Sequence, residues 1–390
     1  MIQTGAHPSW DSSAFHETIV KFVREELRPI ELHVETSGVI PDEIVDKMRQ
    51  LGLFGLSIPE AYGGLGLSTL AEIQVYEVLT KANACFRSRI GTSNSIGSMG
   101  ILYDGTEEQK KKYLPRIAIG EWTAAFALTE PDAGSDASNI TTSAVFEGDN
   151  WVLNGTKQFI TNADCATVFT TIAVTDEQKR SRGGVTAFVV ERDMPGLTIG
   201  KPDRKMGIRG SQTCELVFKN CKVPGENVIG GQAMVGQGFK TAMRVLDKGR
   251  LTMGACALGA SQELLDLCLE RVRGRIAAGI PQDDLQSQLF LLADMATQIF
   301  AARQMLYHAA ELRDKGKTVA HEASMVKLFC TEMASRIADT AMDIFGDAGY
   351  LTKNRVETFL RDIRLYRLFE GTSEIQRLVI SRNLLKGACR

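Results

Sequence analysis

The chain has 390 residues, of which 44% are apolar, 24% charged and 7% aromatic. This composition is typical of globular proteins, and the length suits one large unit or two to three domains. Basic and acidic residues number 45 and 47, for a formal net charge of −2, so neither nucleic acid nor an anionic membrane is expected as a partner.

The eight cysteines form no Cys-x-x-Cys pair, and the five histidines have no ligand-like spacing. We therefore expect reduced core thiols and no metal site. No basic segment followed by an apolar run marks a secretory signal, and no apolar run is long enough to cross a bilayer. The expected location is the cytoplasm of a bacterium, or the mitochondrial matrix if the source is eukaryotic.

From residue 11 to 122 the pattern is helical. A helix is expected to open at Pro41 with an acidic first turn and to end near Gly52. A short charged helix in "EEQKKKYLPRI" is expected to stop before Pro115. In the first helix, apolar residues at helical spacing share one face: Phe15, Ile19, Phe22, Val23 and Leu27.

From residue 123 to 230 the pattern changes to short β-rich runs separated by turns. The first two runs predict a hairpin that turns at residues 148–150. Three further strands are expected in 184–191, 196–200 and 213–223.

From about residue 234 the chain is helical again. A long helix is expected from near Gly238 towards Arg275, followed by helices in 285–316 and 323–346 and a fourth after Thr372. Long antiparallel helices joined by short loops predict a four-helix bundle. The expected domains are 1–122 (helical), 123–232 (β) and 233–390 (helical bundle).

One motif, "FALTEPDAGSD", opens the β region. Residues 131–135 form a turn whose backbone N–H groups can point together at an anion or at the polar edge of a ring. The alternative is a plain surface turn with an aspartate cap.

The second motif is "LFEGTSEIQRLVISRNLL", at 368–385. Ser373 and Gln376 fit a capping box, so a helix is expected to begin there. Glu370 then lies on the approach loop, where its carboxylate can face a cavity. A buried carboxylate away from positive charge has a raised pKa, which suits a general base working near neutral pH. The alternative is a solvated acidic residue before a helix.

Together these motifs and three more segments, "LNGTKQFITNA", "MGIRGSQTCELVFKNCKVP" and "QSQLFLLADM", resemble the acyl-CoA dehydrogenase family in order and spacing. The resemblance extends from about residue 15 to 386. It implies a mostly α fold with a central β domain: an N-terminal helical domain, a middle β-barrel-like domain and a C-terminal four-helix bundle. It also implies FAD as cofactor and, usually, a homotetramer.

The resemblance implies contacts to FAD from several segments. Phe159, Ile160 and Thr161 would pack on the flavin ring, and Arg275 and Gln286 would hold the pyrophosphate and adenosine across a subunit interface. The other implied cofactor contacts are Phe126, Leu128, Thr129, Gly134, Ser135, Asp343, Gly346, Thr372 and Glu374. The implied substrate contacts are Ser135, Asp247, Arg250, Gly371 and Arg87.

Glu370 matches the catalytic base of the family. Some members carry that base instead at the position of Gly249, which cannot act as a base and leaves room. The resemblance implies that the Glu370 N–H and a flavin hydroxyl polarise the thioester carbonyl while Glu370 removes the α-proton. The β-hydride would pass to the flavin, yielding a trans-2-enoyl-CoA from a short-to-medium acyl-CoA, and the electrons would leave to an electron-transferring flavoprotein.

Arg87 matches the position where glutaryl-CoA dehydrogenases and a sulfinopropionyl-CoA desulfinase bind the distal anion of the substrate. In a helix Arg87 and Arg89 are about 200° apart, so only one can face the cavity. The alternative is that Arg87 is exposed or paired with Glu77. Because Gly91 and Phe369 replace a serine and a tyrosine of the glutaryl-CoA enzymes, glutaryl-CoA itself is not expected. A short acyl group with a polar or anionic end is the hypothesis.

Three departures from the family pattern concern FAD. Ala278 replaces an aromatic residue, and Asp343 and Asp347 replace uncharged ones. Added negative charge near the cofactor predicts weaker or more interface-dependent FAD retention, which dialysis after dilution would measure.

Two alternatives to the dehydrogenase stay open: a lyase, such as a desulfinase or decarboxylase acting on an acyl-CoA with a distal anion, and a non-catalytic CoA-ester-binding protein.

Overall fold

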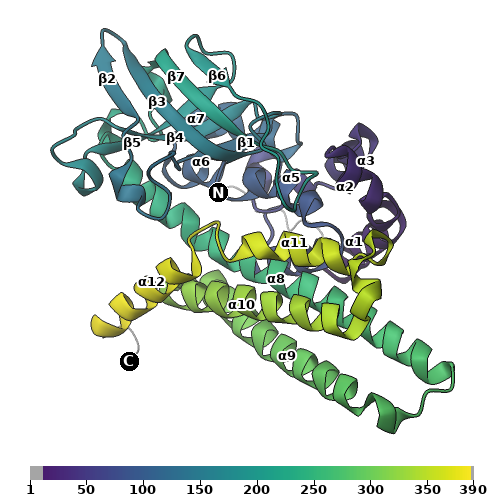
Figure 1. Cartoon of the computed structure of the whole chain (residues 1–390). Coiled ribbons are helices and arrows are strands. Elements are labelled where there is room, and N and C mark those ends of the chain that lie inside the picture. The colour runs from purple at the N-terminus through teal and green to yellow at the C-terminus, as the bar shows by residue number, and fades with distance from the viewer. Residues whose placement is uncertain (1–11, 388–390) are drawn as a thin grey trace, which may run out of the picture.

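Residues 12–387 are described by a computed structural model in which two helical regions flank a single sheet (Figure 1). The first eleven residues and the last three, including Cys389, lie outside this description. Of the cysteines within it, all are free thiols and all but Cys165 are buried, as expected for core thiols.

The N-terminal helices pack around the predicted apolar face. Ile19 and Leu27 are fully buried, and a π-helical segment, Val23–Leu27, continues the first helix. The α-helices of this region are α1 Ser12–Phe22, α2 Glu31–Ser37, α3 Asp42–Gln50, α4 Thr69–Leu79, α5 Ala84–Asn94, α6 Met99–Asp104 and α7 Glu107–Ala118.

The expectation that the charged helix stops before Pro115 is wrong. Helix α7 continues through Pro115 to Ala118. Proline removes one intrahelical hydrogen bond, but Leu114 and Ile117 on either side of it are fully buried in the core. Packing of these two side chains favours another turn of helix over the break that local sequence predicts.

The central region forms one seven-stranded sheet with the order β1-β4-β2-β3-β7-β6, and β5 pairs with β4. The predicted hairpin is present, with Gly148 at a positive φ of 63° in its turn. The strands are β1 Ala124–Ala127, β2 Ser143–Glu147, β3 Asn150–Thr161, β4 Val168–Val174, β5 Val185–Glu191, β6 Leu197–Ile199 and β7 Thr213–Pro224.

Strands β1 and β4, which pair in parallel, were not predicted as strands. Every residue of both is buried, so neither shows the alternation of apolar and polar residues that marks a half-exposed strand. Together they place the first motif at the edge of the sheet that faces α5.

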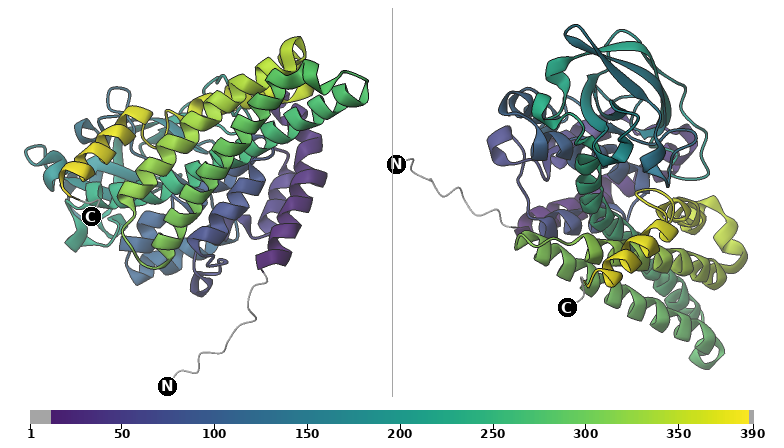
Figure 2. Two further views of the ribbon diagram at one scale, coloured as in Figure 1. Left: turned by 90° about the horizontal axis from the view of Figure 1, so that it is seen from below. Right: turned by 90° about the vertical axis from the view of Figure 1, so that its left-hand side faces the viewer.

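The C-terminal helices extend away from the sheet (Figure 2). Helix α8, 40 residues long, contacts β4 and β5 near its start and then runs between the other helices of the bundle. Helix α11 packs on α8 and α10 and was not predicted from the sequence. The helices are α8 Gly238–Ala277, α9 Gln286–Asp314, α10 Ala320–Phe345, α11 Val356–Tyr366 and α12 Ser373–Leu385.

The largest buried apolar cluster joins the N-terminal helices to α8, α9, α10 and α11. The two helical regions therefore share one core although the sheet separates them in sequence. Among the helices of residues 12–387, none is both long enough and apolar enough to cross a membrane.

Candidate active site

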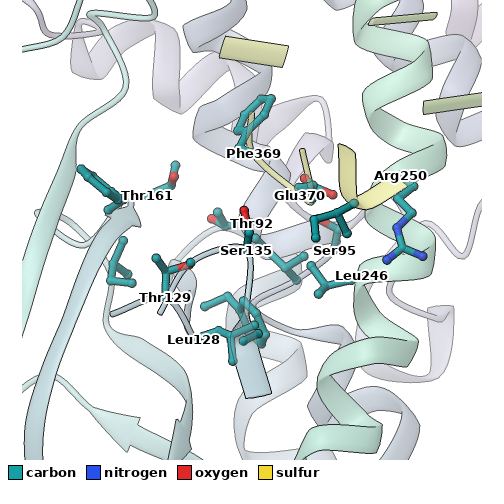
Figure 3. Close-up of a pocket in the computed structure, with 18 of the residues that line it drawn as sticks. Thr92, Ser95, Leu128, Thr129, Ser135, Thr161, Leu246, Arg250, Phe369 and Glu370 are labelled. Carbon is teal, nitrogen blue, oxygen red and sulfur yellow. The ribbon is translucent and has the colours of Figure 1, made fainter. Parts of the chain in front are cut away.

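A cavity of about 760 Å³ lies where α5, α8, the sheet and the loop before α12 meet (Figure 3). Its volume is within the range of small-molecule sites. Figure 3 shows Phe369 and Glu370 across the cavity from Thr129 and Thr161, with Arg250 on a neighbouring helix. The predicted site residues that line it are Arg87, Phe126, Leu128, Thr129, Gly134, Ser135, Phe159, Ile160, Thr161, Arg250, Glu370 and Gly371.

The other predicted site residues do not line this cavity. Asp247 instead binds Arg250, with 2.6 Å between carboxylate and guanidinium. Thr372 caps α12, and Glu374 is exposed. The remaining predicted residues also lie outside the cavity, near the end of α8, the start of α9 and the end of α10: Arg275, Gln286, Asp343 and Gly346. The contact of Arg275 and Gln286 with FAD across a subunit interface stays a prediction, as do the contacts of Asp343 and Gly346 with FAD. The effect of the exposed Asp343 and Asp347 on FAD retention also stays a prediction.

Glu370 lies on the short loop between α11 and α12 with a positive φ of 54°. A non-glycine residue in this region costs roughly 1–3 kcal/mol, so the surrounding structure must impose it. The Oε2 atom of its carboxylate is buried and has no hydrogen-bond partner among the described residues. Glu370 thus lines the cavity while one of its carboxylate oxygens is buried and unsatisfied.

Burial raises the pKa of Glu370, while the charges of Arg87, Lys327 and Arg250 oppose that rise. The expectation of a carboxylate away from positive charge is therefore wrong, although the direction of the pKa shift is as predicted. Desolvation outweighs the three cations because the carboxylate forms no ion pair with any of them.

The capping box predicted from Ser373 and Gln376 is wrong, although α12 does begin at Ser373. The hydroxyl of Thr372 caps α12 by accepting from the backbone N–H of Ile375. Ser373 is not the cap because its hydroxyl donates to Glu332 at 2.6 Å. The Gln376 side chain turns back and donates to the carbonyls of Glu370 and Gly371, at 3.3 and 3.0 Å.

Gly249 on α8 lies directly against the Glu370 carboxylate. A Cβ added at Gly249 would be 1.8 Å from Oε2 of Glu370, far inside van der Waals contact. The structure therefore shows the room that the sequence analysis assigned to this glycine.

The first motif and the end of β3 form the opposite wall. A register shift in the β3–β7 pairing between Lys157 and Ile160 accompanies a positive φ of 58° at Phe159. The Phe159 ring consequently stays 60% exposed while lining the cavity. Asp136 does accept from the N–H of Ser138, so the motif combines an aspartate-capped turn with a place in the cavity wall.

A buried ion pair fixes this wall from behind. Lys157 donates to the Leu128 carbonyl at 3.0 Å and to Glu130 at 2.7 Å. Burial raises the pKa of Glu130, but the Lys157 charge and the donors from Thr141 and Thr142 outweigh it and hold the pKa at about 2. These hydrogen bonds hold the backbone of the motif in place.

Arg87 is only 6% exposed and lines the cavity, so the alternative of a surface arginine is wrong. Its guanidinium donates to the Thr252 hydroxyl at 2.7 Å and lies over the Tyr76 ring, 5.0 Å from the centroid. Glu77 instead pairs with Arg303. Gly91 makes room for this arrangement, because an added Cβ would be 3.1 Å from the guanidinium carbon.

Arg89 faces away from the cavity, donating to Thr123 and packing over the Phe54 ring. Several lining residues were missed although a signal was present. Phe239, Met243 and Leu246 share one face of α8 with the predicted Arg250, at helical spacing. Similar stripes come from α5 and α12: Ser88, Thr92 and Ser95, and Ile375, Leu378, Val379 and Arg382.

The lining is chemically suited to a flavin. The exposed ring of Phe159 offers an apolar face for stacking, and the hydroxyls of Thr129, Ser135 and Thr161 supply hydrogen-bonding groups nearby. The backbone of the first motif frames them. A planar ring with polar edges fits such a wall.

Three family models cover most of the chain. Residues 9–121 match the acyl-CoA dehydrogenase N-terminal domain, 125–221 its middle domain and 236–385 its C-terminal domain. An acyl-CoA dehydrogenase of Bacillus subtilis is 39% identical over 381 residues, which cover 98% of this chain and 100% of the relative.

Solved structures agree with this match. Butyryl-CoA dehydrogenase from Megasphaera elsdenii has a TM-score of 0.92 at 37% identity, covering 98% of this chain and all of that one. A glutaryl-CoA dehydrogenase in complex with glutaryl-CoA has a TM-score of 0.91 at 33% identity, covering 98% and 97%. An acyl-CoA dehydrogenase from Bacillus anthracis, complexed with FAD, has a TM-score of 0.88 at 32% identity, covering 99% and 69%. The chain belongs to the acyl-CoA dehydrogenase family of FAD-dependent oxidoreductases that act on CH–CH bonds.

Proposed function

We propose that the protein oxidises the Cα–Cβ bond of a short-to-medium acyl-CoA thioester to the trans-2-enoyl-CoA, with Glu370 as the base. The observation that carries this proposal is the position of Glu370, whose buried Oε2 has no hydrogen-bond partner among the described residues and which lines a cavity whose other wall fits a flavin. A raised pKa suits such a carboxylate to accept a proton near neutral pH.

The chain's own groups prepare the α-carbon for deprotonation. The backbone N–H of Glu370, which donates to no other described residue, would donate to the thioester carbonyl and so acidify the α-C–H. Glu370 then takes the α-proton in a cavity where apolar residues such as Phe369 and Leu246 limit access of water.

FAD, when bound, supplies the two-electron acceptor for the hydrogen leaving the β-carbon. The residues that would hold its ring are those of the sheet wall, where Phe159 would supply an apolar face and Thr129 and Thr161 would supply hydroxyl groups. Arg275 and Gln286 would act on the FAD of a second subunit, which makes a homotetramer part of the proposal.

The test is product analysis with a panel of saturated, branched and dicarboxylic acyl-CoAs and an artificial electron acceptor. Mass spectrometry should find a product two hydrogen atoms lighter than one of these thioesters, with one acceptor reduced by two electrons for each product formed. No product from any thioester, with protein that carries its full complement of FAD, would refute the proposal.

We also propose that Arg87 selects an acyl group with a polar or anionic end. Its guanidinium is buried in the cavity wall, its Nε has no hydrogen-bond partner, and it forms no ion pair within the described residues. A buried cation in this state favours an anionic ligand over a bare alkyl chain. Gly91 and Phe369 leave the surroundings of this cation different from those that the sequence implies for glutaryl-CoA enzymes.

Replacing Arg87 with methionine should lower kcat/KM for the best dicarboxylic substrate by about 10- to 100-fold, the value of one or two charge-assisted hydrogen bonds. The kcat/KM for an alkyl substrate of equal length should stay the same or rise. Arg89→Met, on the same helix but outside the cavity, should leave the ratio of the two substrates unchanged. An unchanged ratio in Arg87→Met would contradict this assignment.

The same panel of thioesters distinguishes the dehydrogenase from the lyase alternative. A decarboxylase or desulfinase would release carbon dioxide or sulfite from a distal anion without net reduction of the acceptor.

For the dehydrogenase we propose an electron-transferring flavoprotein as the physiological acceptor. The domain limits 1–122, 123–232 and 233–390 belong to this proposal as well.

A further inference from the structure

Lys327 on α10 is a fully buried lysine that forms no ion pair among the described residues. Lysines are almost never buried completely unless a carboxylate compensates the charge. Its one hydrogen bond runs from Nζ to the Gly371 carbonyl, at 2.6 Å. Lys327 does not line the cavity where substrate and flavin are proposed to bind.

The carbonyl that Lys327 holds belongs to the most constrained part of the site. Glu370 and Gly371 both have positive φ, at 54° and 92°. The Gln376 side chain donates to the same Gly371 carbonyl, at 3.0 Å, and is itself fully buried. Two buried donors from α10 and α12 therefore converge on one peptide, which accounts for a loop conformation that would otherwise be unfavourable.

We propose that Lys327 is a positioning residue for the proposed base: its ammonium group fixes the carbonyl of Gly371, the residue after Glu370, and sets a positive charge near the Glu370 carboxylate. This inference rests on the function proposed for Glu370. It extends that function to a residue that does not line the cavity.

The charged groups around Glu370 and Lys327 determine how much the Lys327 charge affects the pKa of Glu370. Glu370 faces Arg87 from α5, Arg250 from α8 and Lys327 from α10. Arg250 is already paired with Asp247, so its charge is partly offset. Lys327 in turn faces Glu370, Arg250, Glu332 and Glu374, and burial lowers its own pKa to about 8. Removing the Lys327 charge should raise the pKa of Glu370 further, because one of the three cations that oppose the rise is lost.

The experiment compares variants that separate the hydrogen bond from the charge. Lys327→Gln keeps a donor and removes the charge, and Lys327→Met removes both. Gln376→Met removes the hydrogen bonds from Gln376 to the Glu370 and Gly371 carbonyls without changing any charge. The rate of anaerobic flavin reduction by the best acyl-CoA is measured against pH for each FAD-loaded variant and for the wild type. Substrate affinity is measured in parallel.

In the wild type the rate should rise with pH as Glu370 ionises. In Lys327→Gln and Lys327→Met this rise should move to higher pH by about one unit, a tenfold loss on the acidic side. Gln376→Met should lower the plateau without moving the rise. Substrate affinity should change little in all three, because none of these residues lines the cavity.

A pH profile of Lys327→Gln that coincides with the wild type would overturn the inference, and this variant serves even where Lys327→Met does not fold. Glu370→Gln, measured beside them, keeps the two proposals apart. If it retains the wild-type rate, the assignment of the base fails. If it is inactive while the lysine variants match the wild type, only the role of Lys327 fails.

Discussion

Replacing Glu370 with glutamine should slow anaerobic flavin reduction by about 10²- to 10⁴-fold, the usual contribution of a positioned general base. Glutamine keeps the size and the hydrogen-bonding capacity of the side chain but cannot accept the α-proton. Stopped-flow absorbance of the FAD-loaded protein, mixed with its best acyl-CoA, measures the effect.

The stability of this variant is an internal control. Burial raises the pKa of Glu370, so the folded state disfavours the charged carboxylate. A neutral amide at the same place should leave the melting temperature unchanged or higher. A large drop in melting temperature would mean that the loss of rate reflects misfolding rather than the missing base.

Gly249→Ala should reduce the rate of flavin reduction by about 100-fold without unfolding the protein. The added Cβ would be 1.8 Å from Oε2 of Glu370, and the carboxylate, at the end of a flexible side chain, is the group that can move away. A displacement of about 1 Å at a reacting group can cost this much rate. The same stopped-flow measurement and a melting curve check both parts.

Gly274→Ala is the matched control because Gly274 lies in the same helix, and no other part of residues 12–387 comes within 4 Å of a Cβ added there. It should keep the wild-type rate and gain up to about 1 kcal/mol of stability, since alanine is the better helix former. A Gly249→Ala variant as fast as Gly274→Ala would show that the Glu370 carboxylate need not occupy its observed position.

Much of the fold follows from local patterns. The amphipathic face of α1, the Gly148 turn and the extent of α8 are all visible in the spacing of apolar and turn residues. Elements with little local contrast were missed: β1 and β4 are buried on both faces. The helix end expected before Pro115 was wrong because Leu114 and Ile117 pack in a core with residues distant in sequence. This packing is not visible from the proline itself.

Glu370 and Arg87 do line the cavity, as the sequence predicts, while their roles in the reaction stay predictions. The electrostatics of the site were not predictable, because Lys327 and Arg250 approach Glu370 from helices distant in sequence. The fully buried Lys327 gives no sign in sequence of the carbonyl that it holds. The same is true of the Thr372 cap, which depends on Glu332 engaging Ser373.

The most direct test of Glu370 as the base is exchange of the α-proton in the absence of oxidation. A 3-thia acyl-CoA has acidic α-C–H bonds but a sulfur atom in place of the β-carbon, so the α-proton can leave while no β-hydride can follow. Mass spectrometry of this thioester, incubated with the FAD-loaded protein in D₂O, reports deuterium uptake at the α-carbon. We predict rapid uptake with the wild type and uptake at the uncatalysed rate with Glu370→Gln. Equal uptake with both proteins would contradict the account and place the base elsewhere.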